Sequence, residues 1–361
     1  MTDFSTKKQA NGGPSPAQGS ATASVQGVVF SPAQGKTVLP KRPCTPSPAP
    51  AAATAPAQGT APFAAPFSPQ AAAPSAPQTA GLSDAAAAGL SSARREQYAA
   101  LLQALRGSGR VAVAYSGGVD STFLLAAALA ACGKENVLAL TACTAALPPR
   151  ELAEAQEYAA ACGVQHTVLY IDAFAVPQFA ANAPDRCYHC KKALFTQMLA
   201  AAHDAGFPVL CEGSNADDVR DYRPGLAAIA ELGVESPLRA AALTKADIRA
   251  ISQALGLPTW HKPSYACLAT RVPYDTPLTP ALLEKVDRAE QALHAAGFAA
   301  GRVRVHGDAA RSEVPAGQLD AVWEPRTRAL LTAGVKAAGF LFVAVDTEGY
   351  RTGSMNDMLP R

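Results

Sequence analysis

No stretch of this sequence reaches the roughly 18 consecutive apolar residues that a membrane-spanning helix needs. The first residues, MTDFSTKKQANGG, also lack the apolar core of a secretory signal peptide. The sequence therefore shows neither of these two signals of a membrane or exported protein. We therefore expect a soluble protein of the cytoplasm that has no membrane partner.

The sequence also lacks a strong excess of charge of either sign. Its 31 basic and 29 acidic residues give a formal net charge of +2, and aromatic residues make up only 6% of the chain. Without residues 1–85, 26 basic and 27 acidic residues remain. A nearly neutral protein with few rings to stack on bases offers no platform for nucleic acid, so no nucleic-acid partner is expected.

Ala, Pro, Gly, Ser and Gln dominate residues 1–85, and no periodic apolar pattern runs through them. Such a composition cannot bury enough apolar surface to fold, which predicts a disordered tail. The remaining residues suffice for two domains. A loop rich in proline and polar residues places the boundary between a domain at 86–272 and a smaller domain at 273–361.

Disulfide bonds are not expected among the eight cysteines, because the cytoplasm is reducing. Four of them lie in segments rich in Ala, Val and Leu, and we expect them to pack as small apolar residues: Cys132, Cys143, Cys162 and Cys211. Cys44 lies in the predicted tail. Only Cys187, Cys190 and Cys267 have polar, loop-like neighbours, so these three are the candidates for chemistry.

Strand and helix patterns alternate along the larger domain. Strands are expected at 111–115, 137–141, 167–171 and 209–212, and helices at 94–105, 121–133, 149–162, 191–205 and 245–255. This alternation predicts an α/β fold in which helices cover both faces of a parallel sheet. The smaller domain is expected to be α+β, with helices at 280–296 and 326–338 and strands at 303–306 and 341–346.

The hexapeptide SGGVDS at 116–121 joins the first strand to its helix, where a parallel sheet presents its ligand crevice. Gly117 and Gly118 let the backbone approach an anion, and Ser116 and Ser121 add hydroxyl donors. Asp120 fits beside phosphates only if it holds Mg²⁺ or turns away. The loop lacks the lysine of the Walker motif and resembles the PP-loop family, whose members cleave ATP to AMP and pyrophosphate. A chance glycine turn is the alternative.

Three further segments carry candidate residues. In DRCYHCKK at 185–192, the CxxC motif opens a helix whose dipole, together with neighbouring cations, is expected to lower the pKa of the thiols. In KPSYACLATR at 262–271, Cys267 lies on a loop. The segment GSNADDVRDYRPG at 213–225 follows a strand, so it reaches the same sheet edge as the phosphate loop. The residues expected to bind Mg²⁺ or substrate are Asn215, Asp217, Asp218, Arg220, Arg271, Arg302 and Arg304.

Together with RVRVHG at 302–307 and GYRTGS at 349–354, these segments resemble the LarE family of PP-loop enzymes, ATP-dependent sacrificial sulfur transferases of nickel-pincer nucleotide cofactor synthesis. The resemblance implies adenylation of a carboxylate on a pyridinium-dicarboxylate mononucleotide, followed by conversion to a thiocarboxylate. It implies ATP and Mg²⁺ as cofactors. It also implies the nucleotide substrate, a sulfur donor, a nickel-insertion enzyme of the same pathway and a homo-oligomer as partners.

Within that family, the cysteine matching Cys267 either gives up its own sulfur or joins Cys187 and Cys190 in binding a four-iron four-sulfur (4Fe-4S) cluster. Three thiolates that bind three irons leave the fourth iron open, which favours the cluster form here. A structural zinc site with His189 or Cys267 is the alternative for the CxxC motif. A tRNA thiolase and a non-catalytic ATP-binding assembly protein are the rival functions.

Two interpretations remain open in the smaller domain. Arg302 and Arg304 share one face of their strand and could clamp a phosphate or carboxylate of the substrate, or they could be solvated surface charges. Glu290 resembles a family carboxylate near the active centre, although a helix-surface glutamate is the ordinary alternative.

Overall fold

The computed structural model describes residues 89–220, 224–263, 267–351 and 353–358, without the side chains of residues 219, 220, 356 and 357. The predicted tail at 1–85 lies outside these residues. The larger sheet has strands β1 (Val111–Ala114), β2 (Val137–Cys143), β3 (Gln165–Tyr170) and β4 (Val209–Cys211). All are parallel, in the order β3-β2-β1-β4. This confirms the predicted α/β fold.

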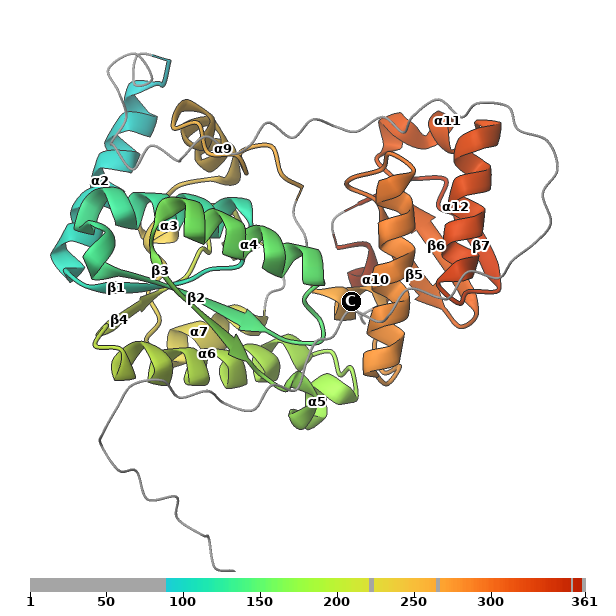
Figure 1. The fold of residues 1–361 in the computed structure, drawn as a ribbon, viewed down its shortest axis with the longest axis horizontal. Helices are drawn as coiled ribbons and strands as arrows, with labels where there is room; N and C mark the ends of the chain where they lie inside the picture. The colour runs from blue at the N-terminus through green and yellow to red at the C-terminus, as the bar shows by residue number, and fades with distance from the viewer. Residues whose placement is uncertain (1–88, 221–223, 264–266, 352, 359–361) are drawn as a thin grey trace, which may run out of the picture. The chain divides into compact units, whose positions relative to one another are not determined.

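Helices cover both faces of this sheet (Figure 1). The helices of this part of the chain are α2 (Ser92–Ser108), α3 (Val119–Cys132), α4 (Pro149–Cys162), α5 (Pro177–Ala180), α6 (Arg186–Asp204), α7 (Pro224–Glu231), α8 (Pro237–Ala240) and α9 (Lys245–Ala254), of which α3 and α4 lie over one face and α6 and α7 over the other. Because side chains alternate along a strand, Val111 and Val113 of β1 pack with α2, α3, α4 and α9, whereas Ala112 packs with α6 and α7. The two faces therefore have separate cores.

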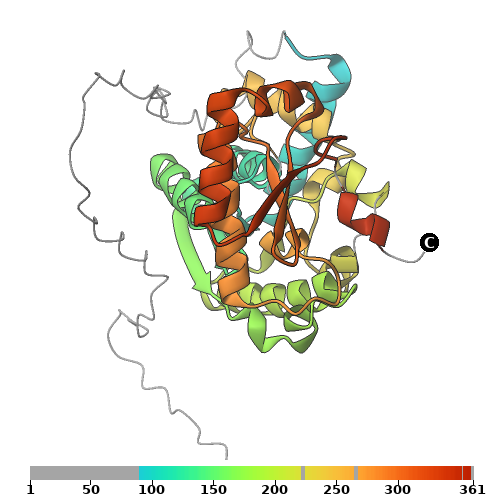
Figure 2. The same cartoon turned by 90° about the vertical axis from the view of Figure 1, so that its right-hand side faces the viewer.

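A second, three-stranded sheet follows, with strands β5 (Arg302–His306), β6 (Ala309–Glu313) and β7 (Phe342–Val345). β6 lies between antiparallel β5 and parallel β7. Helices α10 (Pro280–Ala295) and α12 (Pro325–Ala337) pack against each other and against β5 and β7 respectively, and Figure 2 shows both beside the sheet. The short α11 (Leu319–Val322) precedes α12.

The core of the second sheet is not confined to residues after 273. It also contains Ala146, Phe179 and Leu268, which come from the loop after β2, from α5 and from the 3₁₀ turn η4 (Leu268–Arg271). The other short 3₁₀ turns are η1 (Lys134–Asn136), η2 (Ala173–Ala175), η3 (Ala216–Arg220), η5 (Ala316–Gln318) and η6 (Ser354–Met358). The predicted boundary at 272 stays a prediction.

Two local features differ from the sequence expectation. Helix α6 begins at Arg186 rather than at Lys191, so both cysteines of the CxxC motif lie in its first turns. Strand β6, of sequence AARSE, was not expected because it has no alternation of apolar and polar residues. In addition, no helix in the described part of the chain combines the length and apolarity needed to cross a membrane.

Candidate functional site

The SGGVDS loop connects β1 to α3 and has the geometry of an anion-binding turn. Gly117 has φ +71°, and a Cβ there would stand 3.0 Å from the Cβ of Ala155, so glycine is required for two reasons. Gly118, the N-cap of α3, supplies no side chain to the first turn. The hydroxyls of Ser116 and Ser121 lie 3.1 Å apart. Backbone N–H groups at this helix start can therefore bind phosphate.

Asp120 is held by two partners in this loop. Lys245 Nζ at the start of α9 donates to Asp120 Oδ2 at 2.5 Å, and Asn215 Nδ2 donates to Oδ1 at 3.4 Å. The ion pair balances the carboxylate, which explains how an acidic side chain is accommodated beside a phosphate site. The sequence did not identify Lys245 as a partner of Asp120. The only local feature that could have indicated it is its position one residue after the capping Thr244.

The segment after β4 lies directly against the phosphate loop. A Cβ on Gly213 would stand 3.2 Å from the backbone nitrogen of Ser121. Asp217 accepts a hydrogen bond from the backbone of Lys245 at 2.8 Å, and Asp218 accepts one from the backbone of Asn215 at 2.9 Å. Both carboxylates shape the loop, and their predicted role in binding Mg²⁺ stays a prediction.

The side chain of Arg220 and residues 221–223 lie outside the described residues, as do residues 264–266 of the KPSYACLATR segment. At the start of that segment, Lys262 Nζ donates to the Gly117 carbonyl at 3.2 Å and to Glu151 and Glu154 of α4 at 2.8 and 2.6 Å. Burial alone would lower the pKa of Lys262, but the bonds to both carboxylates outweigh it and raise the pKa. Lys262 thus fixes this segment to the phosphate loop.

The end of the segment is fixed by Arg271. Its Nε and Nη2 donate to the two carboxylate oxygens of Glu290 on α10 at 2.7 and 3.1 Å, and its Nη1 donates to the Cys267 carbonyl at 3.2 Å. Burial would raise the pKa of Glu290, but the charge of Arg271 holds it below its usual range. Glu290 is only 2% exposed, so the interpretation as a surface glutamate is wrong.

Arg302 and Arg304 share one face of β5, and both are buried, so the interpretation as solvated charges is wrong. Arg304 pairs with buried Glu313 at 2.8 Å and donates to the Thr270 carbonyl at 3.0 Å. The guanidinium of Arg302 lies 5.3 Å from the ring centre of Tyr350. Arg304 therefore supports the backbone next to Cys267, and a substrate clamp by either arginine stays a prediction.

Replacing Glu290 by glutamine should lower the free energy of unfolding by about 3 kcal/mol, because the buried Arg271 charge would lose its counterion. Urea unfolding measures this. Glu284→Gln on the same helix is the matched control, since the side chain of Glu284 is 61% exposed and its ion pair with Arg288 spans 3.9 Å. Equal losses of unfolding free energy in both variants would show that the buried Arg271–Glu290 pair stabilises the protein no more than the exposed Arg288–Glu284 pair.

The structure brings the three candidate cysteines together. Cys187 and Cys190 lie in the first turns of α6, and Leu268, next to Cys267, donates its backbone N–H to the Ala146 carbonyl at 3.1 Å. Ala146 follows β2, so Cys267 is held at the carboxyl edge of the sheet that also carries the phosphate loop. The three sulfurs are close enough for their charges to affect one another's pKa.

The expected lowering of the thiol pKa in the CxxC motif is wrong for Cys190. Burial, reinforced by Cys267 and Cys187, raises the pKa of Cys190 to about 12. The expectation counted the helix dipole and cations and omitted the loss of water around the sulfur. Desolvation likewise raises the pKa of Cys267, for which no shift was predicted. Burial therefore favours the protonated form of both thiols.

No group of three His, Cys, Asp or Glu side chains in the described part of the chain is placed to hold a single metal ion. His189 Nε2 contacts Asp185 Oδ2 at 3.1 Å. The thiolates of a multi-iron cluster each bind a different iron, so they need not converge on one point. The zinc site and the cluster both stay predictions.

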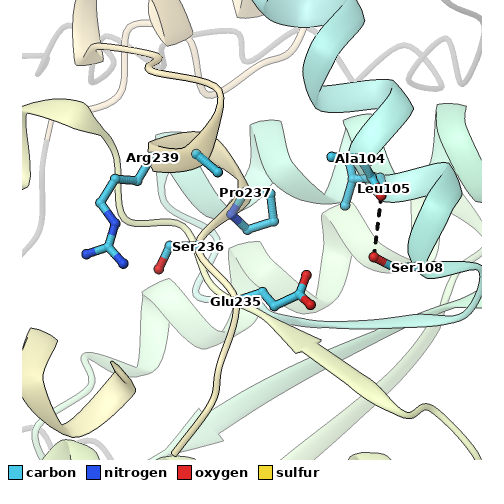
Figure 3. A pocket seen from close by; sticks show the side chains of 8 residues that line it. Ala104, Leu105, Ser108, Glu235, Ser236, Pro237 and Arg239 are labelled. Carbon is cyan, nitrogen blue, oxygen red and sulfur yellow. Dashed lines mark hydrogen bonds between the residues drawn. The ribbon is translucent and has the colours of Figure 1, made fainter. Parts of the chain in front are cut away.

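Two pockets lie away from these residues. One, of about 440 Å³, lies between the end of α2 and residues 235–240 and is lined by Leu105, Ser108 and Arg239 among others (Figure 3). Another, of about 400 Å³, follows α6 and is lined by His203 and Phe207 among others. Neither of these two pockets is lined by a predicted site residue.

Known proteins share these features. The sequence pattern of the asparagine synthase family matches residues 93–205. An uncharacterized protein of Synechocystis sp. is 39% identical over 252 residues, which cover 70% of this chain and 94% of that protein. The pyridinium-3,5-bisthiocarboxylic acid mononucleotide synthase of Lactiplantibacillus plantarum is 36% identical over 265 residues, 73% of this chain and 95% of that enzyme. This chain belongs to its family, the LarE family.

The predicted membership of the LarE family is thereby confirmed, and so is the prediction of an ATP-dependent sulfur transferase of the PP-loop class. Use of ATP follows from the same membership. The role of the three cysteines stays a prediction.

Proposed function

We propose that this LarE-family enzyme adenylates a carboxylate of a pyridinium-dicarboxylate mononucleotide and converts it to a thiocarboxylate with sulfur held at Cys187, Cys190 and Cys267. The observation that carries the proposal is the location of the three cysteines at the sheet edge that carries the phosphate loop. The product belongs to nickel-pincer nucleotide cofactor synthesis. A cytoplasmic location, a homo-oligomer, an external sulfur donor and a nickel-insertion partner are parts of the same proposal.

In the first half-reaction, the substrate carboxylate attacks the α-phosphorus of ATP, and pyrophosphate leaves. The backbone of the phosphate loop holds the phosphates, and Lys245 and Asp120 set the local charge. Asn215, Asp217 and Asp218 are the residues that would hold Mg²⁺, and the ion would neutralise charge on the leaving pyrophosphate. In the second half-reaction, a sulfur nucleophile attacks the acyl carbon and AMP leaves with the bonding electrons.

The three cysteines suit a four-iron four-sulfur cluster by their number and chemistry, because three thiolates can bind three irons, and Cys187 and Cys190 lie one turn apart at the start of α6. Such a cluster would supply a bound sulfide as the sulfur nucleophile. The cysteines of this chain would hold it, and the exposed position of Cys267 leaves the site accessible to the adenylate. This form is catalytic, since no cysteine is consumed.

Anaerobic purification followed by iron, sulfide and ultraviolet-visible analysis tests the proposal. We expect about four irons per chain and an unchanged protein mass after turnover. Iron-free protein that loses about 34 Da, the mass of H₂S, after one turnover would instead show that Cys267 is consumed. That result would overturn the three-cysteine site and leave the reaction class intact.

A further inference from the structure

Arg186, the first residue of α6, is buried and forms no ion pair within the part of the chain that the structure describes. It is only 3% exposed, and neither its Nε nor its Nη1 has a hydrogen-bond partner among the described residues. Its guanidinium carbon lies 4.4 Å from the ring centre of Tyr274. Two other buried arginines each form an ion pair with a glutamate. Arg271 pairs with Glu290, and Arg304 pairs with Glu313. Arg186 is thus a buried cation with open N–H donors.

An unpaired buried guanidinium is costly, since it has lost water and gained no acceptor. The Tyr274 ring offsets part of this cost through a cation–π interaction, but it does not accept conventional hydrogen bonds from the guanidinium N–H groups. An unpartnered buried guanidinium therefore indicates a place where a ligand binds and accepts hydrogen bonds from its N–H groups. Because the guanidinium is a cation, the expected ligand is an anion.

The location of Arg186 indicates which anion. It directly precedes Cys187 and lies four residues before Cys190 on α6, so its side chain and that of Cys190 share one face of the helix. Burial raises the pKa of Cys190 and of Cys267, and the charge of Arg186 opposes that effect at both thiols. A sulfide or thiolate accepts hydrogen bonds strongly, whereas a neutral thiol is a weak acceptor. The guanidinium is therefore placed beside the CxxC motif, where an anionic sulfur would accept its open N–H groups.

We propose that Arg186 is the anion-binding residue of the three-cysteine site, and that its free N–H groups hold the anionic sulfur that the enzyme transfers. Arg186 is a positioning residue in this role, since it stabilises the charged sulfur and does not itself react. The inference deepens the proposed sulfur transfer and rests on it. It assigns to the site a cationic residue in addition to its thiol ligands.

The first test uses metal-free protein without ATP or substrate. Iodoacetamide alkylation of Cys267 at pH 7.5, followed by peptide mass spectrometry, should be about 10-fold slower in Arg186→Gln, because the thiolate would lose its cation. Arg186→Lys should retain most of the rate. Arg288→Gln is the control, since the Arg288 side chain is 54% exposed on α10. Alkylation of Arg186→Gln at the wild-type rate would contradict the inference.

Stability separates this role from a structural one. Removing an unpaired buried charge should leave the Tm of the metal-free protein unchanged or higher, whereas loss of a structural contact would lower it. In protein loaded with iron and sulfide, Arg186→Gln should lose iron to a chelator several-fold faster than the wild type. Normal alkylation and iron retention with a raised KM would instead assign Arg186 to an anionic group of the substrate, and the inference would fail.

The outcomes are separable from those of the proposed function. If the wild-type protein takes up no iron, the cluster is refuted, but the alkylation comparison still decides the role of Arg186. If iron binds to the wild-type protein, and Arg186→Gln has the wild-type alkylation rate and iron retention, the cluster is supported and the inference is refuted.

Discussion

Cys267→Ser protein is expected to transfer no sulfur, at least about 100-fold below wild type, while pyrophosphate release stays within about twofold. In the proposed reaction Cys267 acts only in the sulfur transfer, whereas the contacts that hold the phosphate loop come from other groups. Lys262 holds the Gly117 carbonyl, and Lys245 holds Asp120. The two half-reactions should therefore separate. Pyrophosphate release and thiocarboxylate formation are measured in parallel on the same preparation.

Variants of the other two cysteines distinguish the two forms of the chemistry. Cys187→Ser and Cys190→Ser should each abolish transfer if the three thiolates act as a set, and neither should matter if Cys267 alone gives up its sulfur. Cys132→Ser is the matched control, because this half-buried cysteine contacts only the Leu105 carbonyl through its sulfur at 3.3 Å. Loss of pyrophosphate release in Cys267→Ser would show that the half-reactions are coupled.

Lys245→Met is expected to reduce ATP-dependent pyrophosphate release by about 100-fold or more, because a preorganised cation beside the phosphates would be lost. Asp120 would then face the triphosphate with only the weaker contact to Asn215 at 3.4 Å. Sulfur transfer from chemically supplied acyl adenylate should be nearly unaffected. Pyrophosphate release and ATP affinity, measured separately, show whether binding or turnover is lost.

Lys336→Met is the control for Lys245→Met, since Lys336 is an exposed lysine in the last turn of α12. Its replacement removes the same charge from the protein as a whole. Pyrophosphate release at the wild-type rate in Lys245→Met would mean that Lys245 only neutralises Asp120. The double variant Lys245→Met with Asp120→Asn would then also be active.

The fold and the phosphate loop could be predicted because their signals are local. The run at 111–115, the glycines that follow it and the helical apolar pattern of α3 lie within about 20 consecutive residues, where backbone geometry and periodicity are decisive. The start of α6 was misjudged because its first turn, RCYHC, lacks an apolar repeat and an N-cap hydrogen bond. β6 was missed because its pairing with β5 and β7 stabilises a sequence with no strand pattern.

Burial was the main quantity that the sequence could not supply. Arg302, Arg304 and Glu290 could be read as surface charges because their partners are not neighbours in the chain. Arg304 meets Thr270 across 34 positions, and Arg271 meets Glu290 across 19. The same omission produced the wrong expectation for the thiol pKa, since desolvation depends on atoms that fold around the sulfur.

The sequence by itself determined the α/β class, the ATP-binding loop and the three cysteines that are candidates for sulfur chemistry, because each depends on residue type at short spacing. Only the tertiary structure decided that the three cysteines meet at one sheet edge, that Lys245 balances Asp120 across 125 positions, and that Arg186 is buried and forms no ion pair within the described part of the chain. The physical reason is that charge pairing and desolvation depend on distances in space, which residues far apart in the chain acquire only when it folds.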